Sequence, residues 1–490
     1  MVQKRKIWLP LWLILGLGLA FLLRLPSLFE PYSYGDECIY LTLGQAIRKG
    51  LILYRDIYDN KPPLLYLLAA ISGNLFRFRL LLLIWSLITI FSFFKLAKIL
   101  FPKKEKIVQF STLIFAFFSS IPWFEAGVAN AEVFMLLPTF AGIILIFCGK
   151  KSVLQRYFLA GILFSLATLF KVPAAFDFLA VLVFLLITVE KKNYQLLITN
   201  YLLLFLGFSL PILLTFFYFW SQGALNQYLT AAFLQNLPYL SSWGGNVQTG
   251  PLNQELLLRF LITIAFLCLV FWKKKGVNPF SLFLFSWFVL SLFAATLSSR
   301  PYPHYLVQVL PSLSLLFGLL FSKLNSREHL FVSISLASFL FAVFYFQFWF
   351  YPIFSPYKNF FLFLSRKWSQ EQYFASFGKK VSQNYKLAEF IVSHTKENEK
   401  IFVWGDSPCV YALSRRLPAG RYTASYHIAD FNGYQEASLA IQKEKPRFII
   451  DLQDEEKQFS KLRELILQKY SLFKKINGAE VFRRASPKMI

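Results

Sequence analysis

The chain has 490 residues, of which 56% are hydrophobic and 16% are charged, whereas ordinary soluble domains carry about 25% charged residues. Its 51 lysines and arginines against 26 acids leave a net charge of +25, but the basic residues stand in short clusters between apolar runs, as in membrane proteins. The 58 Phe, 24 Tyr and 11 Trp are too apolar for a disordered chain. Composition therefore disfavours a soluble enzyme, a nucleic-acid-binding domain and a disordered protein.

About eleven apolar segments are long enough to cross a bilayer, which takes about 20 mostly apolar residues. The first, 7–29, follows the basic residues Lys4, Arg5 and Lys6 and lacks a small-residue cleavage site, so we expect a retained helix and not a signal peptide. The other expected spans are 80–101, 107–124, 131–149, 154–170, 173–189, 196–220, 255–272, 280–297, 306–322 and 330–352.

Basic clusters occupy every second loop between these spans, and basic loops stay on the cytoplasmic side. The clusters are Lys103 to Lys106, Lys150-Lys151, Lys191-Lys192, Lys273 to Lys275 and Lys323 to Arg327. We therefore expect a cytoplasmic N-terminus and the loops 30–79, 125–132, 171–172, 221–254 and 298–305 outside. The segment 62–78 is also apolar, but a span there would reverse every later loop, so we expect a helix at the outer interface.

From about Pro356 the sequence becomes mixed and charged, which predicts a C-terminal domain over 356–490 after a membrane domain over 1–352. Two short buried strands are expected at 400–405 and 447–451. Helical periodicity covers 385–395 and 433–443. These segments predict a small α/β domain, which the charge pattern places outside the cell membrane.

The four cysteines show no Cys-x-x-Cys spacing, and two of them lie in apolar runs. They are Cys38, Cys148, Cys268 and Cys409. We therefore expect neither a zinc site nor a disulfide framework. A chain without obvious secretory disulfides fits the plasma membrane of a bacterium.

The first outer loop holds the densest group of polar residues. Asp36 and Glu37 follow directly on the first span, where the pKa of a carboxylate rises unless a partner pairs with it. A base at that depth is useful for catalysis. The alternative is a solvated loop in which Asp36 caps a helix.

Two cations in the same loop are suited to bind a phosphate. Lys61 precedes Pro62-Pro63, which stiffen the backbone that presents its ammonium. Arg55 can bind a phosphate through two hydrogen bonds and Lys61 as a point charge. The alternative, ion pairs of the two cations with Asp56 and Asp59, stays open.

The second outer loop supplies a further acid, Glu132. In the expected orientation it enters its span from the same face as Asp36, so that two carboxylates would line one external cavity and divide base and metal or acceptor duties. The alternative is a helix that is capped by Asn130 and has Glu132 in its first turn.

Two other outer segments carry candidate contacts. Lys171, before Val172-Pro173, is either part of a turn between spans or an anion contact. Arg300, His304 and Tyr305 open a later span and suit phosphate or sugar contacts. Anchoring in the aromatic belt is the alternative for the tyrosines of this segment.

Three motifs resemble those of the GT-C membrane glycosyltransferases, and most of all the group of protein mannosyltransferases and aminoarabinose transferases. The motifs are Gly35-Asp36-Glu37 with Tyr40, then Tyr54-Arg55-Asp56 followed by Asp59-Asn60-Lys61-Pro62-Pro63-Leu64, and Asn130-Ala131-Glu132-Val133-Phe134. The resemblance covers roughly 1–350 in layout and is sharpest over 35–64. It implies a GT-C-like polytopic α-helical membrane protein with about eleven transmembrane helices, outer juxtamembrane helices and the small outer α/β domain.

The resemblance also implies a polyprenyl-phosphate sugar donor, a site on the extracytoplasmic face and inversion at the anomeric carbon. Asp36 would be the general base, Glu132 the second acid, and Lys61 would face the donor phosphate. The expected substrate-binding residues are Glu37, Tyr40, Arg55, Asp59, Lys61, Asn130, Lys171, Arg300, His304 and Tyr305. Some relatives have an acid directly before the lysine, where this chain has Asn60, so a divalent metal cofactor stays open.

The resemblance does not identify the acceptor, which would be a lipid, a glycan or a protein. The outer loop 221–254 has Gly223, Gly244, Gly245 and Gly250 beside Tyr239 and Trp243, and we expect it to move over the donor. A transporter or flippase is the main alternative, although the polar residues gather at one face and not at the midplane. A sensor with a partner-binding C-terminal domain is a third.

Overall fold

The computed structural model describes residues 9–148, 152–189, 194–242, 253–454 and 459–485. The chain divides into two compact units. Unit 1 comprises Met1–Ser27, Leu80–Phe217 and Leu234–Ile353, and unit 2 comprises Leu28–Arg79, Tyr218–Phe233 and Phe354–Ile490. Several predicted features lie outside the described residues, namely Lys4 to Lys6, Lys150, Lys151, Lys191, Lys192, Trp243, Gly244, Gly245 and Gly250. The predicted domain boundary at 352–356 stays a prediction.

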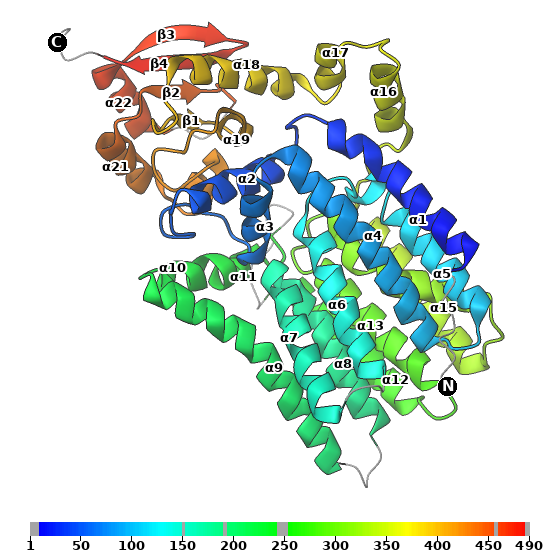
Figure 1. The fold of residues 1–490 in the computed structure, drawn as a ribbon. Helices are drawn as coiled ribbons and strands as arrows, with labels where there is room; N and C mark the ends of the chain where they lie inside the picture. Colours follow the sequence, from blue (N-terminus) through cyan, green and yellow to red (C-terminus); the bar gives the residue numbers. More distant parts are fainter. Residues whose placement is uncertain (1–8, 149–151, 190–193, 243–252, 455–458, 486–490) are drawn as a thin grey trace, which may run out of the picture. The chain divides into compact units, whose positions relative to one another are not determined.

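Each of the eleven expected spans falls on a helix (Figure 1). They are α1 (Leu11–Arg24), α4 (Leu75–Leu100), α5 (Glu105–Phe118), α6 (Ala131–Phe147), α7 (Val153–Phe170), α8 (Ala175–Thr188), α9 (Tyr194–Ser221), α12 (Gln254–Trp272), α13 (Pro279–Ala295), α14 (Leu310–Leu319) and α15 (Ser326–Tyr345). Among the described residues, five helices are long and apolar enough to cross a membrane, and five more are apolar but shorter.

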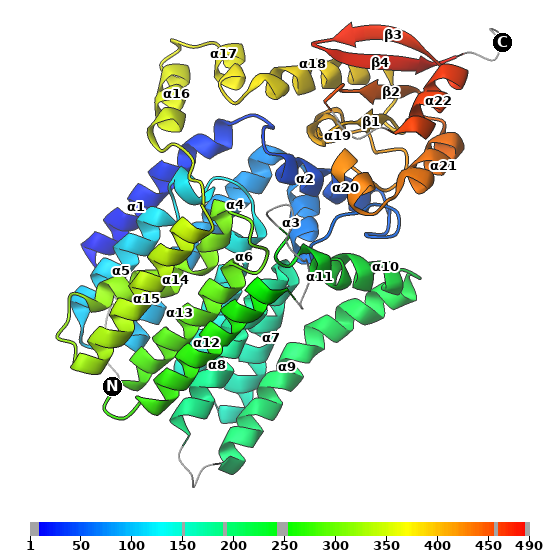
Figure 2. The same ribbon diagram turned by 180° about the vertical axis from the view of Figure 1, so that it is seen from behind.

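The helices of unit 1 pack in pairs, α6 with α7, α8 with α13 and α5 with α14 (Figure 2). Helix α13 is buried on all sides from Ser281 to Ala295, as expected of a helix that is apolar all round and lies inside a bundle. Short 3₁₀ turns connect the helices at the polar loops, including η3 (Val172–Ala174) between α7 and α8 and η6 (Pro303–Gln308) before α14. These turns carry several of the predicted site residues.

The interfacial helix is shorter than predicted. Helix α3 covers Leu64–Ser72, and Gly73 ends it with a φ of 76°, in the left-handed region that favours glycine. The next helix, α4, begins at Leu75 and therefore takes up the residues 75–78 that were predicted for the interfacial segment. Arg48 donates a hydrogen bond of 2.8 Å to the Ala70 carbonyl near the end of α3.

Unit 2 contains a four-stranded sheet in the order β1-β2-β4-β3. Strands β1 (Phe402–Trp404) and β2 (Phe448–Asp451) are parallel, and β4 (Ala479–Arg484) pairs antiparallel with both β2 and β3 (Tyr470–Ile476). The two predicted strands are confirmed. Strands β3 and β4 were not predicted, because five successive residues of β3 are exposed and the strand lacks the alternation that reveals a strand in sequence.

The remaining helices of unit 2 come from Leu28–Arg79, Tyr218–Phe233 and Phe354–Ile490. They are α2 (Gly35–Arg48), α3, α10 (Leu225–Leu229), α16 (Phe354–Leu364), α17 (Gln370–Ala375), α18 (Lys379–His394), α19 (Cys409–Ser414), α20 (Ser425–Asp430), α21 (Tyr434–Glu444) and α22 (Ser460–Lys469). Helices α18 and α21 confirm the helical periodicity at 385–395 and 433–443. Leu387 and Ile391 of α18 pack with Val403, Ile450 and Val481 of the strands in one apolar core.

A disulfide joins Cys38 of α2 to Cys409 of α19, across 371 residues of sequence. The expectation of no disulfide framework was therefore wrong. Spacing rules detect cysteines that pair within a short segment, and only the fold brings these two together. The bond ties the first outer loop to the C-terminal segment within unit 2.

We expect the double variant Cys38→Ser/Cys409→Ser to lose about 2 to 5 kcal/mol of unfolding free energy in unit 2, because the cross-link no longer restricts the unfolded chain. Thermal unfolding of the detergent-solubilised protein measures the change. Cys268→Ser is the control, since Cys268 is free and exposed. Equal unfolding temperatures for all three proteins would contradict a stabilising disulfide.

Candidate active site

Asp36 lies in the first turn of α2, but it does not cap the helix, because Tyr34 holds the cap position. Its Oδ2 accepts hydrogen bonds from the Tyr40 hydroxyl (3.0 Å) and the Lys61 ammonium (3.3 Å). Tyr40 stands one turn further along α2 and so faces the same side. Burial raises the pKa of Tyr40 far above its usual value, which keeps its hydroxyl a donor. The Asp36 side chain remains 36% exposed and is the accessible acid of this cluster.

Two buried tyrosines hold the backbone of Lys61. The Tyr66 hydroxyl accepts the Lys61 N–H at 3.0 Å, and the Tyr54 hydroxyl donates to the Lys61 carbonyl at 2.7 Å. The ammonium also lies 5.0 Å from the centre of the Tyr40 ring. Neither tyrosine was among the predicted site residues; Tyr54 was named only as part of the Tyr54-Arg55-Asp56 motif, and Tyr66 lies in an apolar segment.

Asp59 is the buried acid of the cluster, with 2% of its side chain exposed. Its Oδ2 accepts the Tyr66 hydroxyl at 2.9 Å and lies 3.9 Å from the Lys61 ammonium, and its Oδ1 accepts the Asn60 N–H at 2.8 Å. Oδ1 of Asp59 also lies 3.6 Å from Nε2 of His427. The ion pair of Lys61 with Asp59, which the sequence left open as the alternative to phosphate binding, is therefore present. Lys61 also contacts Asp36.

The described residues contain no group of three or more His, Cys, Asp or Glu side chains placed to bind a metal ion. Asp59 and His427 approach each other, but the Lys61 ammonium beside Asp59 already supplies positive charge there. Two ligands next to a cation do not form the donor set of a metal centre. No chemical step below depends on a metal.

Glu37, which was predicted to bind substrate, is 1% exposed and paired with Arg79 at the start of α4. The Arg79 guanidinium donates to both carboxylate oxygens of Glu37, at 2.5 to 3.2 Å, and to Glu30 at 2.8 Å. Consecutive residues on a helix point in different directions, so Asp36 contacts Lys61 and Tyr40 whereas Glu37 contacts Arg79. The ion pair of Glu37 joins α2 to α4.

Arg55 forms the ion pair that sequence analysis gave as the alternative. Its guanidinium donates to both oxygens of Asp56, at 2.8 and 3.0 Å, and to the Gln222 carbonyl at 2.8 Å. These hydrogen bonds lower the pKa of Asp56. The Arg55 side chain is 41% exposed, so the pair lies at the surface.

A second polar cluster lies in unit 1. Lys171, at the end of α7, donates to the carboxylate of Glu132 in the first turn of α6. Nε2 of His304 lies 3.6 Å from the same carboxylate oxygen, and its Nδ1 lies 2.7 Å from Glu125. Lys171 therefore takes part both in the predicted turn and in an ion pair.

Glu125 connects this cluster, although it was not among the predicted site residues. Its Oε2 accepts a hydrogen bond of 2.8 Å from the side chain of Asn130 and also contacts His304. Asn130 holds the cap position of α6, as the sequence alternative proposed, but its side chain bonds Glu125 and no helix N–H. The left-handed φ of Glu125, 56°, sharply turns the loop at this residue.

Gln308 fixes the two turns of unit 1 against each other. Its side-chain amide donates to the Pro173 carbonyl and to Asp177, both at 2.9 Å. Asp177 also accepts from the Trp287 indole at 2.6 Å. This network holds the η3 turn, which directly follows Lys171, beside η6, which carries His304.

Tyr305 and Arg300 extend the cluster toward the end of the loop 221–254. Tyr305 lies under the Lys171 ammonium, 4.1 Å from the ring centre, and its hydroxyl is 3.0 Å from that of Tyr239 in α11 (Asn236–Tyr239). The Arg300 guanidinium stacks on Tyr239 at 3.9 Å and donates to Ser242. The movement predicted for this loop stays a prediction.

Asp36 and Lys61 belong to unit 2, whereas Glu132, Lys171 and His304 belong to unit 1. The sequence prediction that Asp36 and Glu132 line one external cavity stays a prediction.

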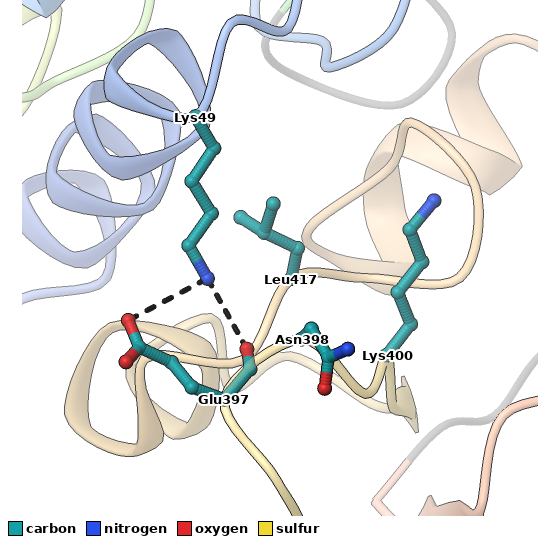
Figure 3. A pocket seen from close by; sticks show the side chains of 5 residues that line it. All are labelled: Lys49, Glu397, Asn398, Lys400 and Leu417. Atoms are coloured by element: carbon teal, nitrogen blue, oxygen red, sulfur yellow. Dashed lines mark hydrogen bonds and ion pairs between the residues drawn. The ribbon is translucent and has the colours of Figure 1, made fainter.

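A surface pocket of about 390 Å³ lies elsewhere in unit 2, lined by Lys49, Glu397, Asn398, Lys400 and Leu417 (Figure 3). The Lys49 ammonium fills one side and bonds the Glu397 carbonyl at 3.2 Å. Lys49 follows the last residue of α2 and Asp36 lies in its first turn. A helix of this length extends about 20 Å, so this pocket is separate from the Asp36 cluster.

No protein-family model and no curated protein matches the sequence. Solved structures do match in fold. ArnT from Cupriavidus metallidurans, bound to undecaprenyl phosphate, aligns with a TM-score of 0.59 and 13% identity over 97% of this chain and 98% of that chain. Its apo structure aligns with a TM-score of 0.56 and 13% identity over 96% and 97%.

The chain has the fold of ArnT. The predicted GT-C fold class is thereby confirmed, and the ArnT fold together with the apolar helices makes this a membrane protein. The alignment includes unit 2 as well as the helical unit, since it spans nearly the whole of both chains. At 13% identity, the likeness to ArnT concerns the fold and not the activity.

The charge of His304 makes the stability of unit 1 depend on pH. Burial by itself would lower the pKa of His304, but the carboxylates of Glu132 and Glu125 outweigh it and raise the pKa. The stabilisation from protonated His304 is therefore complete below about pH 6.5 and is lost as the pH rises through the folded-state pKa.

We expect the unfolding temperature to fall between pH 6 and pH 9, and His304→Gln to reduce that slope. Thermal unfolding in detergent at several pH values measures it, with the exposed His329→Gln as the control. A slope that His304→Gln leaves intact would show that the pair contributes nothing measurable.

Proposed function

We propose that the chain is a membrane glycosyltransferase that moves a sugar from a polyprenyl-phosphate donor to an acceptor on the extracytoplasmic face, with inversion. The observation that carries the proposal is the half-exposed carboxylate of Asp36, held by the Lys61 ammonium and the Tyr40 hydroxyl. A carboxylate that is fixed by two donors and still accessible has the geometry of a general base.

In the proposed reaction Asp36 takes a proton from the acceptor hydroxyl or amine. The acceptor atom forms a bond to the anomeric carbon as the bond from that carbon to the phosphate oxygen breaks. The electron pair leaves with the polyprenyl phosphate, which needs no strong acid because a phosphate is a fair leaving group. Lys61 supplies positive charge at the leaving oxygen, and attack opposite to that oxygen inverts the anomeric carbon.

Unit 1 holds a second cluster of acids and cations, and we propose that Lys171 and Arg300 in it bind a negatively charged group. The Lys171 ammonium donates to Glu132 and lies over the ring of Tyr305. A cation suits a phosphate, and an aromatic ring suits a sugar. Sugar and acceptor identity are not part of the proposal, because a fold does not fix substrate.

Two findings support a lipid donor. ArnT, whose fold the chain shares, has been solved with undecaprenyl phosphate. The long apolar helices α9, α12 and α15 expose large side chains over most of their length, as expected for helices in contact with acyl and prenyl chains.

The disulfide supports the proposed topology. Disulfides persist in oxidising compartments and are rare in the cytosol, and Cys38–Cys409 lies in unit 2. We therefore propose that unit 2 faces the extracytoplasmic side and that the basic loops of unit 1 face the cytoplasm.

We expect Asp36→Asn to lower turnover by about 100-fold or more, because the amide cannot accept the proton of the acceptor. Purified protein is incubated with a panel of polyprenyl-phosphate sugars and candidate acceptors, and release of polyprenyl phosphate is followed. Asp454→Asn is the matched control, since Asp454 forms a surface ion pair with Lys380 in the same unit.

Full turnover in Asp36→Asn would reject Asp36 as the base. Translocation of a lipid-linked sugar by reconstituted protein, with no transfer by the wild type, would favour the transporter alternative instead. Sugar transfer and translocation are both measured in vesicles that contain the reconstituted protein.

A further inference from the structure

We propose that helix α16 lies on the surface of the bilayer and binds lipid through one face. This lipid-binding face comprises Phe354, Phe361 and Leu364, with Lys358 beside them. Acyl chains cover the three apolar side chains, and phosphate headgroups contact the ammonium. The proposal concerns how unit 2 meets the membrane, and it does not rest on the proposed enzymatic activity.

Another face of α16 is occupied by protein. Phe360 is 9% exposed, and its ring centre lies 5.5 Å from that of Phe29. Phe363 stacks on Tyr373 of α17, with ring centres 4.7 Å apart. All four residues belong to unit 2. Their contacts fix the rotation of the helix about its axis and therefore determine which side chains point outward.

The lipid-binding face is apolar and exposed. Phe354 is 84% exposed, and Phe361 and Leu364 are each 64% exposed. At about 3.6 residues per turn, the three side chains lie within about 80° around the helix axis. Single exposed apolar residues are common on protein surfaces, but a group of large ones on one face marks an interaction site.

The neighbours of α16 place it at the surface of a membrane. Phe29, which contacts Phe360, is the last residue of the candidate span Leu11–Phe29. A second candidate span, Ser326–Tyr345, is joined to α16 by residues 346–353 alone. A helix that packs against the end of one span and follows closely on another lies where a span leaves the hydrocarbon. This conclusion holds for either orientation of the protein in the bilayer.

The length of α16 suits a helix that lies on the membrane and does not cross it. Its 11 residues extend about 16 Å, roughly half of the hydrocarbon thickness of about 30 Å. Amphipathic helices with apolar residues on one side and cations beside them lie in the plane of the interface. Lys358 stands one turn from both Phe354 and Phe361, so its stem can pack along them while its ammonium reaches the phosphates.

The charges near this face favour lipid over a second copy of the chain. Lys358, Arg366 and Lys367 are exposed, and anionic headgroups attract such cations. The helix dipole explains cations at the C-terminal end, but it does not explain Lys358 in the middle of the helix. A symmetric contact between two copies would bring the same cations together.

A spin label at Phe361→Cys measures the depth of this face in the full-length protein. The free cysteines are first replaced by Cys148→Ser and Cys268→Ser, and the protein is placed in nanodiscs of phosphatidylcholine and phosphatidylglycerol. Collision rates with oxygen and with a water-soluble nickel complex give the depth. We expect the label about 5 to 10 Å below the headgroup phosphates. The matched control is Leu467→Cys on α22, which is 84% exposed and should collide mainly with nickel.

A second measurement uses the wild-type protein. A lipid with a photoreactive acyl chain is cross-linked in the same nanodiscs, and mass spectrometry locates the modified peptides. We expect adducts on 354–364 and none on α22. Replacing phosphatidylglycerol by phosphatidylcholine should reduce the adducts on 354–364. Lys358→Glu should lose this preference, whereas Lys461→Glu, at an exposed lysine of α22, should keep it.

The proposal is supported by a lipid-immersed label at Phe361→Cys together with adducts on 354–364. A label that collides mainly with nickel, as in Leu467→Cys, overturns it. A label that is shielded from both reagents, without adducts on 354–364, also overturns it and shows that unit 1 or a second copy covers the face. An unchanged lipid preference in Lys358→Glu overturns the contact of Lys358 with headgroups.

Discussion

The Lys61 ammonium lies between two carboxylates, 3.3 Å from Asp36 and 3.9 Å from Asp59, and the arrangement of unit 2 depends on this contact. Asp59 is almost fully buried, and a buried charge without partners costs several kcal/mol, about 3 to 5 when a pair is broken. Tyr66, the Asn60 N–H and Lys61 together meet that requirement. Asp36, by contrast, keeps over a third of its side chain exposed. One acid is therefore held in place and the other is left accessible.

The same requirement organises unit 1. Glu132 is paired with Lys171, and Glu125 is paired with His304 and hydrogen-bonded by Asn130. These residues come from turns between apolar helices, where a polar side chain cannot stay buried unless a neighbouring turn offers a partner. Pairing thus determines which turns lie together, and the cations held there suit a negatively charged substrate.

Unit 2 is assembled from stretches that are far apart in sequence. The disulfide Cys38–Cys409 and the contact of His427 with Asp59 each join the segment 30–79 to the C-terminal segment. The alignment with ArnT includes this segment as well as the helices.

The sequence by itself predicted the eleven apolar helices, the two helices at 385–395 and 433–443 and two strands of the α/β segment, because hydropathy and periodicity act over a few turns of chain. For Lys61 and Arg55 it left two kinds of partner open, a phosphate or the nearby acids Asp56 and Asp59. Only the tertiary structure decided that Cys38 meets Cys409, that His427 meets Asp59 and that Glu125 connects Asn130 with His304. Two of these contacts join residues more than 350 positions apart, and a third joins a loop to a distant turn. Partners at such distances are chosen by the packing of whole segments, on which local composition carries no information.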